Sequence, residues 1–218
     1  MKRIAQLIRE KWPEYLLEIL VIIIGILLAL ALNNWNDDRK SKIEEQKVLS
    51  VLHQEFAGNI EALSSILKSH QSNIESLQKL LPSLYATSES TDGHTMVSGF
   101  RQAMYSNTYN PTFGVMNALL NSEEINVIRN EYLKYELARM PGRILDYTEE
   151  EGIILKVITE IVIPEMVKID PSQEYQYNIT LLNMSQQMIP NFESTIVEGK
   201  KLLEEMTKIS EVIQSEIR

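Results

Sequence analysis

The feature that most constrains this chain is an apolar segment, Leu16–Leu32, in which Glu18 is the one charged residue. A helix rises about 1.5 Å per residue, so this segment is just long enough to cross the hydrocarbon core of a bilayer. Trp12 and Trp35 stand at its two ends, and indole rings favour the headgroup region of a membrane. We therefore predict one transmembrane helix over residues 16–35, in contact with the lipid bilayer, with both tryptophans as interface anchors.

Basic residues are balanced on the two sides of the predicted span. Four Lys or Arg residues precede it, and four follow it closely, namely Arg39, Lys40, Lys42 and Lys47. Residues 1–15 are predicted to form a basic amphipathic tail, and anchors with so short a tail usually keep that end inside the cell. We therefore expect the rest of the chain to be exported; a cytoplasmic domain is the alternative. The lack of a small-residue cleavage site after the span disfavours a cleaved signal peptide.

One face of the predicted span combines small residues with a carboxylate. Glu18, Gly25 and Ala29 lie on the same side of a helix because they are spaced seven and four residues apart. Small residues at a spacing of four let two helix backbones approach closely in a membrane. This pattern predicts an association face, used by a homo-oligomer or by a partner membrane helix. Glu18 either handles a coupling ion in such a contact or lies at the interface with its carboxylate in water.

Residues 36–218 are predicted to form one acidic domain. The formal net charge of the chain is −9 and the first 35 residues carry +1, so the domain carries −10. No basic stripe is available to displace counterions from phosphates, which argues against a nucleic-acid partner. The chain has no cysteine, and its three histidines have no ligand-spaced partners nearby. We therefore expect neither a metal site nor a cofactor.

Residues at a seven-residue spacing form three series between Lys40 and Leu84. The series are Leu49, Phe56, Leu63, His70, Leu77 and Leu84; Leu52, Asn59, Ile66, Asn73 and Leu80; and Ile60, Leu67, Ile74 and Leu81. Together they make an apolar stripe wider than the seam of a two-stranded coiled coil. The pattern predicts an all-α fold, with one N-terminal transmembrane helix followed by a long-helix antiparallel bundle.

Three polar residues, Asn59, His70 and Asn73, interrupt this apolar stripe. We favour a hydrogen-bonded structural role for them. The alternatives are that they specify helix register, bind a ligand, or sense pH through protonation of the imidazole.

Turn-forming residues after Leu84 predict a chain reversal, which short helices over 95–105 and 112–120 then follow. The loop between these helices is polar and aromatic. Its candidates for lining a cleft are Tyr105, Tyr109, Asn110 and Phe113. A plain connector is the alternative interpretation.

The remaining sequence predicts two further helical segments. Apolar residues at helical spacing over 123–164, interrupted at Pro141, predict a second long arm that is kinked and antiparallel to the first. The last helix is expected to start after Pro190, with Asn191 as its cap. The acidic run Glu149–Glu151 is interpreted as a solvated face, because adjacent residues of a helix point in different directions and cannot chelate a cation together.

Two stretches of the chain carry a family signature. The first is Glu18–Leu30, EILVIIIGILLAL, followed by Asn33-Asn34-Trp35-Asn36; the second runs from Tyr109-Asn110-Pro111-Thr112-Phe113 through Leu119-Leu120-Asn121-Ser122 to Ile128-Arg129-Asn130. They resemble a bacterial family of single-pass membrane proteins with a domain of unknown function, DUF6090. The resemblance implies a mostly helical domain attached to a bacterial membrane, and it brings no known activity. The expected location is the inner membrane, with the domain in the periplasm or, alternatively, in the cytoplasm.

No phosphate-binding glycine loop, zinc-protease motif or nucleophile elbow occurs in the sequence, so we do not expect an enzyme. The leading hypothesis is a non-catalytic, membrane-anchored interaction or assembly module of the cell envelope. One alternative is a membrane-tethered sensor of a small molecule or of stress. Another is an accessory subunit of an ion-driven membrane complex that uses Glu18.

Overall fold

The computed structural model describes residues 2–85, 93–105, 107–170 and 174–217. Regular structure in these ranges is helical throughout, which confirms the all-α fold. The chain divides into two compact units, Met1–Lys47 and Val48–Arg218, and helix α1 (Lys2–Tyr85) contributes residues to both.

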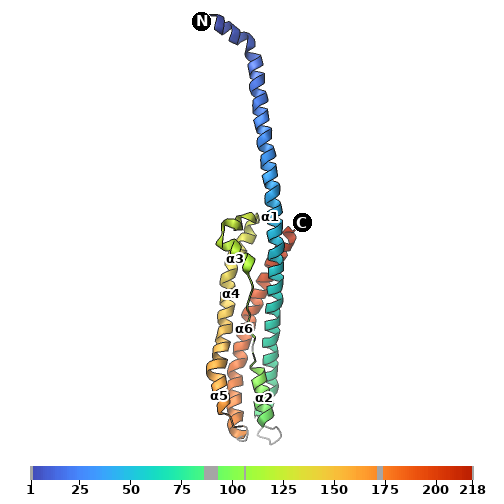
Figure 1. The fold of residues 1–218 in the computed structure, drawn as a ribbon. Coiled ribbons are helices and arrows are strands. Elements are labelled where there is room, and N and C mark those ends of the chain that lie inside the picture. The colour runs from blue at the N-terminus through green and yellow to red at the C-terminus, as the bar shows by residue number, and fades with distance from the viewer. Residues whose placement is uncertain (1, 86–92, 106, 171–173, 218) are drawn as a thin grey trace. The chain divides into compact units, whose positions relative to one another are not determined.

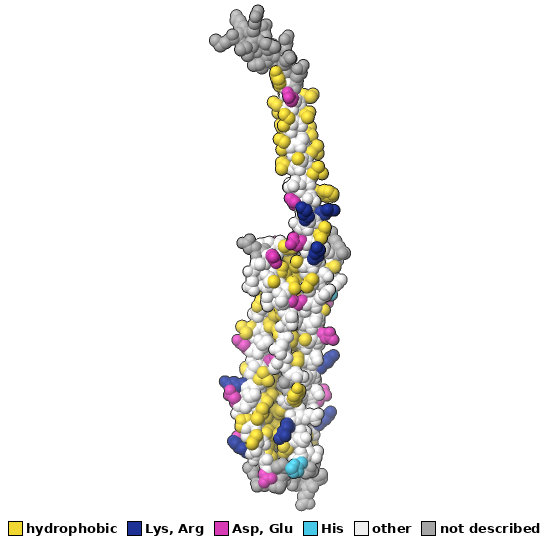
Figure 2. All heavy atoms as spheres, in the orientation of Figure 1, with side chains coloured by type: hydrophobic (Ala, Val, Ile, Leu, Met, Phe, Trp, Pro, Cys, Tyr) yellow, Lys and Arg dark blue, Asp and Glu magenta, His cyan; other side chains and the backbone are white. Residues whose placement is uncertain are grey.

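In the first unit, apolar side chains of α1 are exposed along the segment that the sequence marks as a span (Figure 2). Its large apolar residues between Leu16 and Leu32 are each 44% to 67% exposed. By length and composition, this part of α1 is able to cross a membrane. The side chains of residues 1–11, in the predicted basic tail, lie outside the described residues.

The second unit is a helical bundle in which successive stretches of chain run in opposite directions (Figure 1). The helices that follow α1 are α2 (Gly93–Ala103), α3 (Gly114–Asn121), α4 (Glu131–Val157), α5 (Ile163–Lys168) and α6 (Glu174–Glu216). A short 3₁₀-helix, η1 (Glu123–Val127), precedes α4, and a π-turn, η2 (Ile158–Val162), joins α4 to α5. Helices α2 and α3 run back along α1, α4 and α5 follow the direction of α1, and α6 returns.

The direction of α4 corrects the prediction of a second long arm antiparallel to α1. Residues 107–113, which we call the strap, are not helical and join α2 to α3. A non-helical chain covers up to about 3.3 Å per residue, against about 1.5 Å in a helix. The strap, with the short helices on either side of it, therefore returns the chain along the length of the bundle before α4 begins. Helix α4 therefore starts at the same end of the bundle as the second unit's part of α1 (Figure 1).

Helix α4 also starts and continues differently from the prediction. The expected helix from Glu123 is interrupted after η1, and Asn130 caps α4 by accepting a hydrogen bond from the Leu133 amide at 3.0 Å. Pro141 lies inside α4 without ending it. Helical structure also continues past Pro164, as α5. Proline lacks an amide hydrogen, and its ring presses against carbonyl groups of the preceding helical turn. The wider turn of η2, which directly precedes α5, relieves this contact.

The expected start of the last helix after Pro190 is wrong as well. Helix α6 begins at Glu174, and Asn191 is an interior residue whose carbonyl oxygen accepts a hydrogen bond from Thr195. Pro190 is exposed, so water can reach the carbonyl group that its ring deprives of a partner. Met188 and Phe192 are fully buried on either side of Pro190, so packing against the bundle outweighs the cost of the proline.

The core of the bundle consists of two apolar clusters. Each cluster draws on α1, α4 and α6. The residues that flank the gap between the clusters are Leu67 and Ile74 on α1, Tyr147 and Ile154 on α4, and Ile196 and Leu202 on α6. On each helix the gap is about two turns long. The buried residues inside this gap include His70, Asn73 and Glu151, which we call the polar layer.

Helix α6 approaches the polar layer closely because residue 199 is a glycine. A Cβ atom at Gly199 would lie 2.4 Å from Cδ2 of Leu67 and 2.8 Å from Cε2 of Tyr147. The Leu67 methyl group can move, but the Tyr147 ring is rigid and buried. Any larger side chain at this position would push α6 away from both α1 and α4.

Candidate functional site: a buried polar layer, a strap and a groove

The strap is attached to α1 by an amide side chain. Asn59 donates a hydrogen bond from Nδ2 to the carbonyl oxygen of Thr112 at 2.7 Å, and its Oδ1 accepts one from the Thr112 amide at 2.8 Å. Asn59 is buried, so its amide completes both backbone hydrogen bonds of a residue that has no helical or sheet partner. The hydrogen-bonded role predicted for Asn59 is thus observed, with the strap as its partner.

Glu55, one turn before Asn59, holds the start of α3. Its carboxylate oxygens accept hydrogen bonds from the amides of Val115 at 2.9 Å and Met116 at 3.0 Å. Free amides at a helix N-terminus carry a partial positive charge, which a carboxylate stabilises. Because no side chain of the preceding residue, Phe113, caps this helix, Glu55 supplies the cap from a different element.

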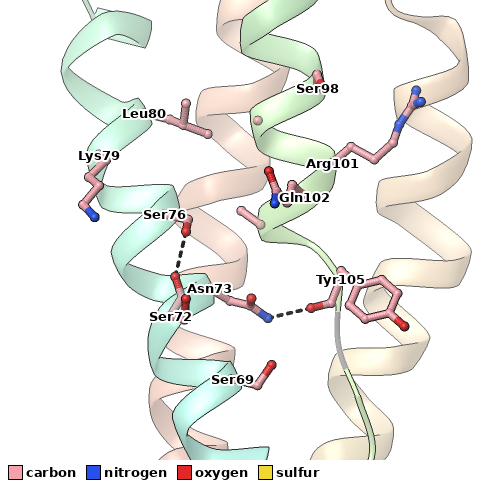
Figure 3. A pocket seen from close by; sticks show the side chains of 12 residues that line it. Ser69, Ser72, Asn73, Ser76, Lys79, Leu80, Ser98, Arg101, Gln102 and Tyr105 are labelled. Atoms are coloured by element: carbon pink, nitrogen blue, oxygen red, sulfur yellow. Dashed lines mark hydrogen bonds between the residues drawn. The ribbon is translucent and has the colours of Figure 1, made fainter.

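Asn73 makes a similar contact at the other end of the connection between α2 and α3. Its Nδ2 donates a hydrogen bond to the carbonyl oxygen of Tyr105 at 2.9 Å (Figure 3). Asn59 and Asn73 therefore interrupt the apolar stripe of α1 for one shared reason. Both supply hydrogen bonds to backbone that is not helical.

Glu151 holds the strap from the opposite side. Its Oε2 accepts a hydrogen bond from the Tyr109 amide at 2.8 Å, and its Oε1 accepts one from the Tyr147 hydroxyl at 3.3 Å. Glu151 is only 3% exposed, which corrects the interpretation of Glu149–Glu151 as a solvated face. A signal for this burial exists in the sequence, because Glu151 stands four residues after Tyr147 and seven after Ile144.

His70 completes the polar layer from α1. Its ring is fully buried and lies 5.4 Å, between centroids, from the ring of Phe192. Nε2 of His70 is 3.5 Å from Oε1 of Glu151. Neither ring nitrogen has a hydrogen-bond partner within the described chain. The imidazole and the carboxylate are therefore two ionisable groups in contact inside the core.

The two buried phenols of Tyr109 and Tyr147 are held in their neutral form. Burial raises the pKa of Tyr109 above its ordinary value. Burial also raises the pKa of Tyr147, and the negative charge of Glu151 and its hydrogen bond with the hydroxyl raise it further. An acid whose pKa is raised on folding stabilises the fold fully below its unfolded pKa, about 10 for tyrosine, and loses that contribution as the pH rises above it.

We therefore expect the bundle to lose stability above about pH 10, where unfolding lets both buried phenols ionise. Replacing Tyr109 with Phe removes one of these groups and should lessen the alkaline loss of stability. The measurement is denaturant unfolding at neutral and alkaline pH, followed by circular dichroism and phenolate absorbance. The exposed Tyr105→Phe variant is the control, and an equal effect of both substitutions would contradict the assignment.

A groove with a volume of about 950 Å³ lies between α1 and α2, beside the polar layer. Its lining is Ser69, Ser72, Asn73, Ser76, Lys79, Leu80, Ser98, Gly99, Arg101, Gln102, Ala103 and Tyr105. Figure 3 shows small hydroxyl groups and the amides of Asn73 and Gln102 along its centre. The side chains of Lys79 and Arg101 extend to opposite sides. The centre of the groove thus carries hydroxyl and amide groups and no charged group.

The four residues predicted to line a cleft fall in different environments. Tyr105 lines the groove and is 71% exposed. Asn110 is exposed, and its side chain contacts Thr108 of the strap. Tyr109 and Phe113 are buried in the core cluster that includes Phe56 and Tyr147, where Tyr109 lies edge-on to Tyr147 and Phe113 edge-on to Phe56. Glu151 bonds to the Tyr109 amide of the strap and Glu55 to the first amides of α3, and neither was predicted to be a site residue.

A family model described as a family of unknown function, DUF6090, matches residues 18–149 of the chain. The chain belongs to the DUF6090 family. No curated protein and no solved structure matches it. The family match includes all but the first two residues of the apolar segment, the strap, and the α1 residues Glu55, Asn59, His70 and Asn73, and it ends two residues before Glu151.

Within the described residues, no group of three or more His, Asp or Glu side chains is placed to hold a metal ion. The features of this DUF6090 member that stand out chemically are the His70–Glu151 contact, the hydrogen-bonded strap and the groove between α1 and α2. The exposed apolar segment of α1, with Glu18, Gly25 and Ala29 all exposed, is the further candidate.

Proposed function

We propose that the chain is a membrane-anchored helical interaction module, whose span associates with a second copy or with another membrane helix. The observation that supports this most directly concerns Gly25. A Cβ atom at this position would have no neighbour within 4 Å in the chain, so no packing inside the chain requires a glycine there. Ala29, one turn later, is exposed in the same way. Small residues that the chain does not use itself suit close contact with another helix.

The test is crosslinking of the full-length chain in membranes or mild detergent. Ala29→Leu should reduce the crosslinked oligomer, because the larger side chain keeps the two backbones apart. Ala31→Leu is the matched control, since it makes the same change about 200° around the helix from Ala29. Gly25→Leu should act as Ala29→Leu does. Oligomers that persist equally in all three variants would rule out this association face.

We also propose that the bundle lies in the periplasm of a bacterial cell, with the short basic tail in the cytoplasm. Reporter proteins fused after Arg218, one active only outside the cytoplasm and one only inside it, distinguish the two orientations. Activity of the external reporter supports the proposal. Activity of the internal one reverses it and makes the chain a tether at the inner face of the membrane.

A small-molecule sensor is a second candidate function, which the groove between α1 and α2 favours. Hydroxyl and amide groups such as Ser72, Asn73 and Gln102 line it, and they suit a neutral ligand rich in hydroxyl groups, with the exposed Tyr105 ring at its edge. Thermal unfolding of the full-length chain with a panel of neutral sugars and polyols tests this function. A ligand whose stabilising effect disappears in Ser72→Trp supports it, and no shift across the panel argues against it.

A further inference from the structure

His70 lies in the core of the bundle, in contact with a carboxylate. Its side chain is fully buried, and neither Nδ1 nor Nε2 has a hydrogen-bond partner within the described chain. Buried polar atoms without partners are costly, so such a histidine needs a compensating interaction. The polar group that faces it is the carboxylate of Glu151, 3.5 Å from Nε2.

The other groups around this contact carry no opposite charge. From the strap, the Tyr109 amide donates to Glu151, and from α4 the Tyr147 hydroxyl does the same. From α6, Phe192 presents an aromatic ring to His70. No Lys or Arg is among the described contacts of Glu151. Within the part of the chain that the structure describes, the imidazolium form of His70 is the cation that contacts this buried carboxylate, and pairing is what makes a buried carboxylate tolerable.

We propose that His70 and Glu151 form a buried proton-binding site, and that the proton it holds controls how firmly the strap is attached. With one proton bound, the imidazolium donates from Nε2 to Oε1 of Glu151 and the two charges cancel. When that proton leaves, the carboxylate keeps its full charge in the core without a cation beside it, and its donors are the Tyr109 amide, the Tyr147 hydroxyl and, in one tautomer, the N–H of the neutral imidazole. The inference does not depend on membrane association.

The direction of the pH effect follows from the unfolded state. A histidine in an unfolded chain loses its proton above about pH 6.5. If the folded pair still holds one proton there, folding takes up a proton, and stability falls as the pH rises through neutrality. The opening equilibrium then rises by at most about tenfold per pH unit. A histidine buried without a carboxylate has the opposite dependence, because burial favours its neutral form.

The Tyr109 amide reports directly on this site, because its hydrogen bond ends on Glu151. We would measure its hydrogen exchange in the full-length chain in detergent at about pH 6 and pH 8, and convert the rates to protection factors. Protection should fall with rising pH in the wild type and change little with pH in His70→Gln. The matched control is the double variant His53→Gln/His94→Gln, which should keep the wild-type dependence.

Protection that rises with pH in the wild type, or a fall that persists in His70→Gln, would overturn the proposal. A second measurement holds even where His70→Gln fails to fold. In the double variant, His70 is the one histidine left, and the nitrogen chemical shifts of its ring report its charge in the folded protein. A cationic ring slightly above neutral pH supports the proton site, and a neutral ring excludes it.

Discussion

Replacing Glu151 with alanine is expected to lower the free energy of unfolding of the bundle by about 3–5 kcal/mol, the usual cost of breaking a buried pair from one side. The substitution leaves the Tyr109 amide and the Tyr147 hydroxyl without an acceptor, and it leaves His70 without its carboxylate. Each of these groups is buried, so water does not replace the lost partner. Denaturant unfolding of the full-length chain in detergent, followed by circular dichroism, measures the effect.

Two further variants separate burial from charge. Glu151→Gln keeps an acceptor for the Tyr109 amide, so its cost should be smaller than that of Glu151→Ala. Glu149→Ala changes an exposed neighbour in the same acidic run and should alter the free energy of unfolding by no more than about 0.5 kcal/mol. Equal effects at positions 149 and 151 would mean that the acidic run is solvated after all.

Replacing Asn59 with leucine is expected to cost about 2–4 kcal/mol, because two buried backbone groups lose their partners at once. Both the amide and the carbonyl group of Thr112 bond to the Asn59 side chain, and leucine offers neither a donor nor an acceptor. Leucine is also the residue that the apolar stripe of α1 would favour at this position. From the apolar stripe alone one would therefore expect Asn59→Leu to raise the free energy of unfolding, which is the opposite change.

The same denaturant measurement decides between these signs. Hydrogen exchange at the Thr112 amide should increase in Asn59→Leu, since this amide donates to the Asn59 side chain. Gln71→Leu is the matched control, a change from an amide to leucine at an exposed position of α1 that should have little effect on the bundle. A more stable Asn59→Leu variant would show that the strap does not need this attachment.

The pattern of α1 could be read directly from the sequence. All six members of the first seven-residue series, from Leu49 to Leu84, are buried, and the long helix ends at Tyr85, one residue beyond the predicted end. The reason is local, because a seven-residue repeat places its members on one face of a helix whatever that face meets. The span over residues 16–35 was predicted from another local signal, the length and apolar composition of the segment.

The helices that contain prolines were predicted less well. Pro141, where a break or a kink was predicted, lies inside α4, and Pro190 lies inside α6, although the last helix was expected to start after it. A proline costs a helix about 3 kcal/mol or more, and a prediction from the neighbouring sequence includes only that cost. Buried residues on either side, such as Met188 and Phe192, return more than this by packing against the bundle.

Local patterns along the chain were enough to predict that it is all-α, acidic after its apolar segment, and polar at Asn59, His70 and Asn73 within an apolar stripe. They could not predict which groups these polar residues contact, because that depends on the tertiary structure. The strap places backbone without helical partners beside α1, and α4 brings Glu151 to His70 across the core. Contacts between residues so far apart in the chain depend on the direction in which each segment crosses the bundle. A helical repeat shows which face of a helix is buried, and the path of the chain decides what that face meets.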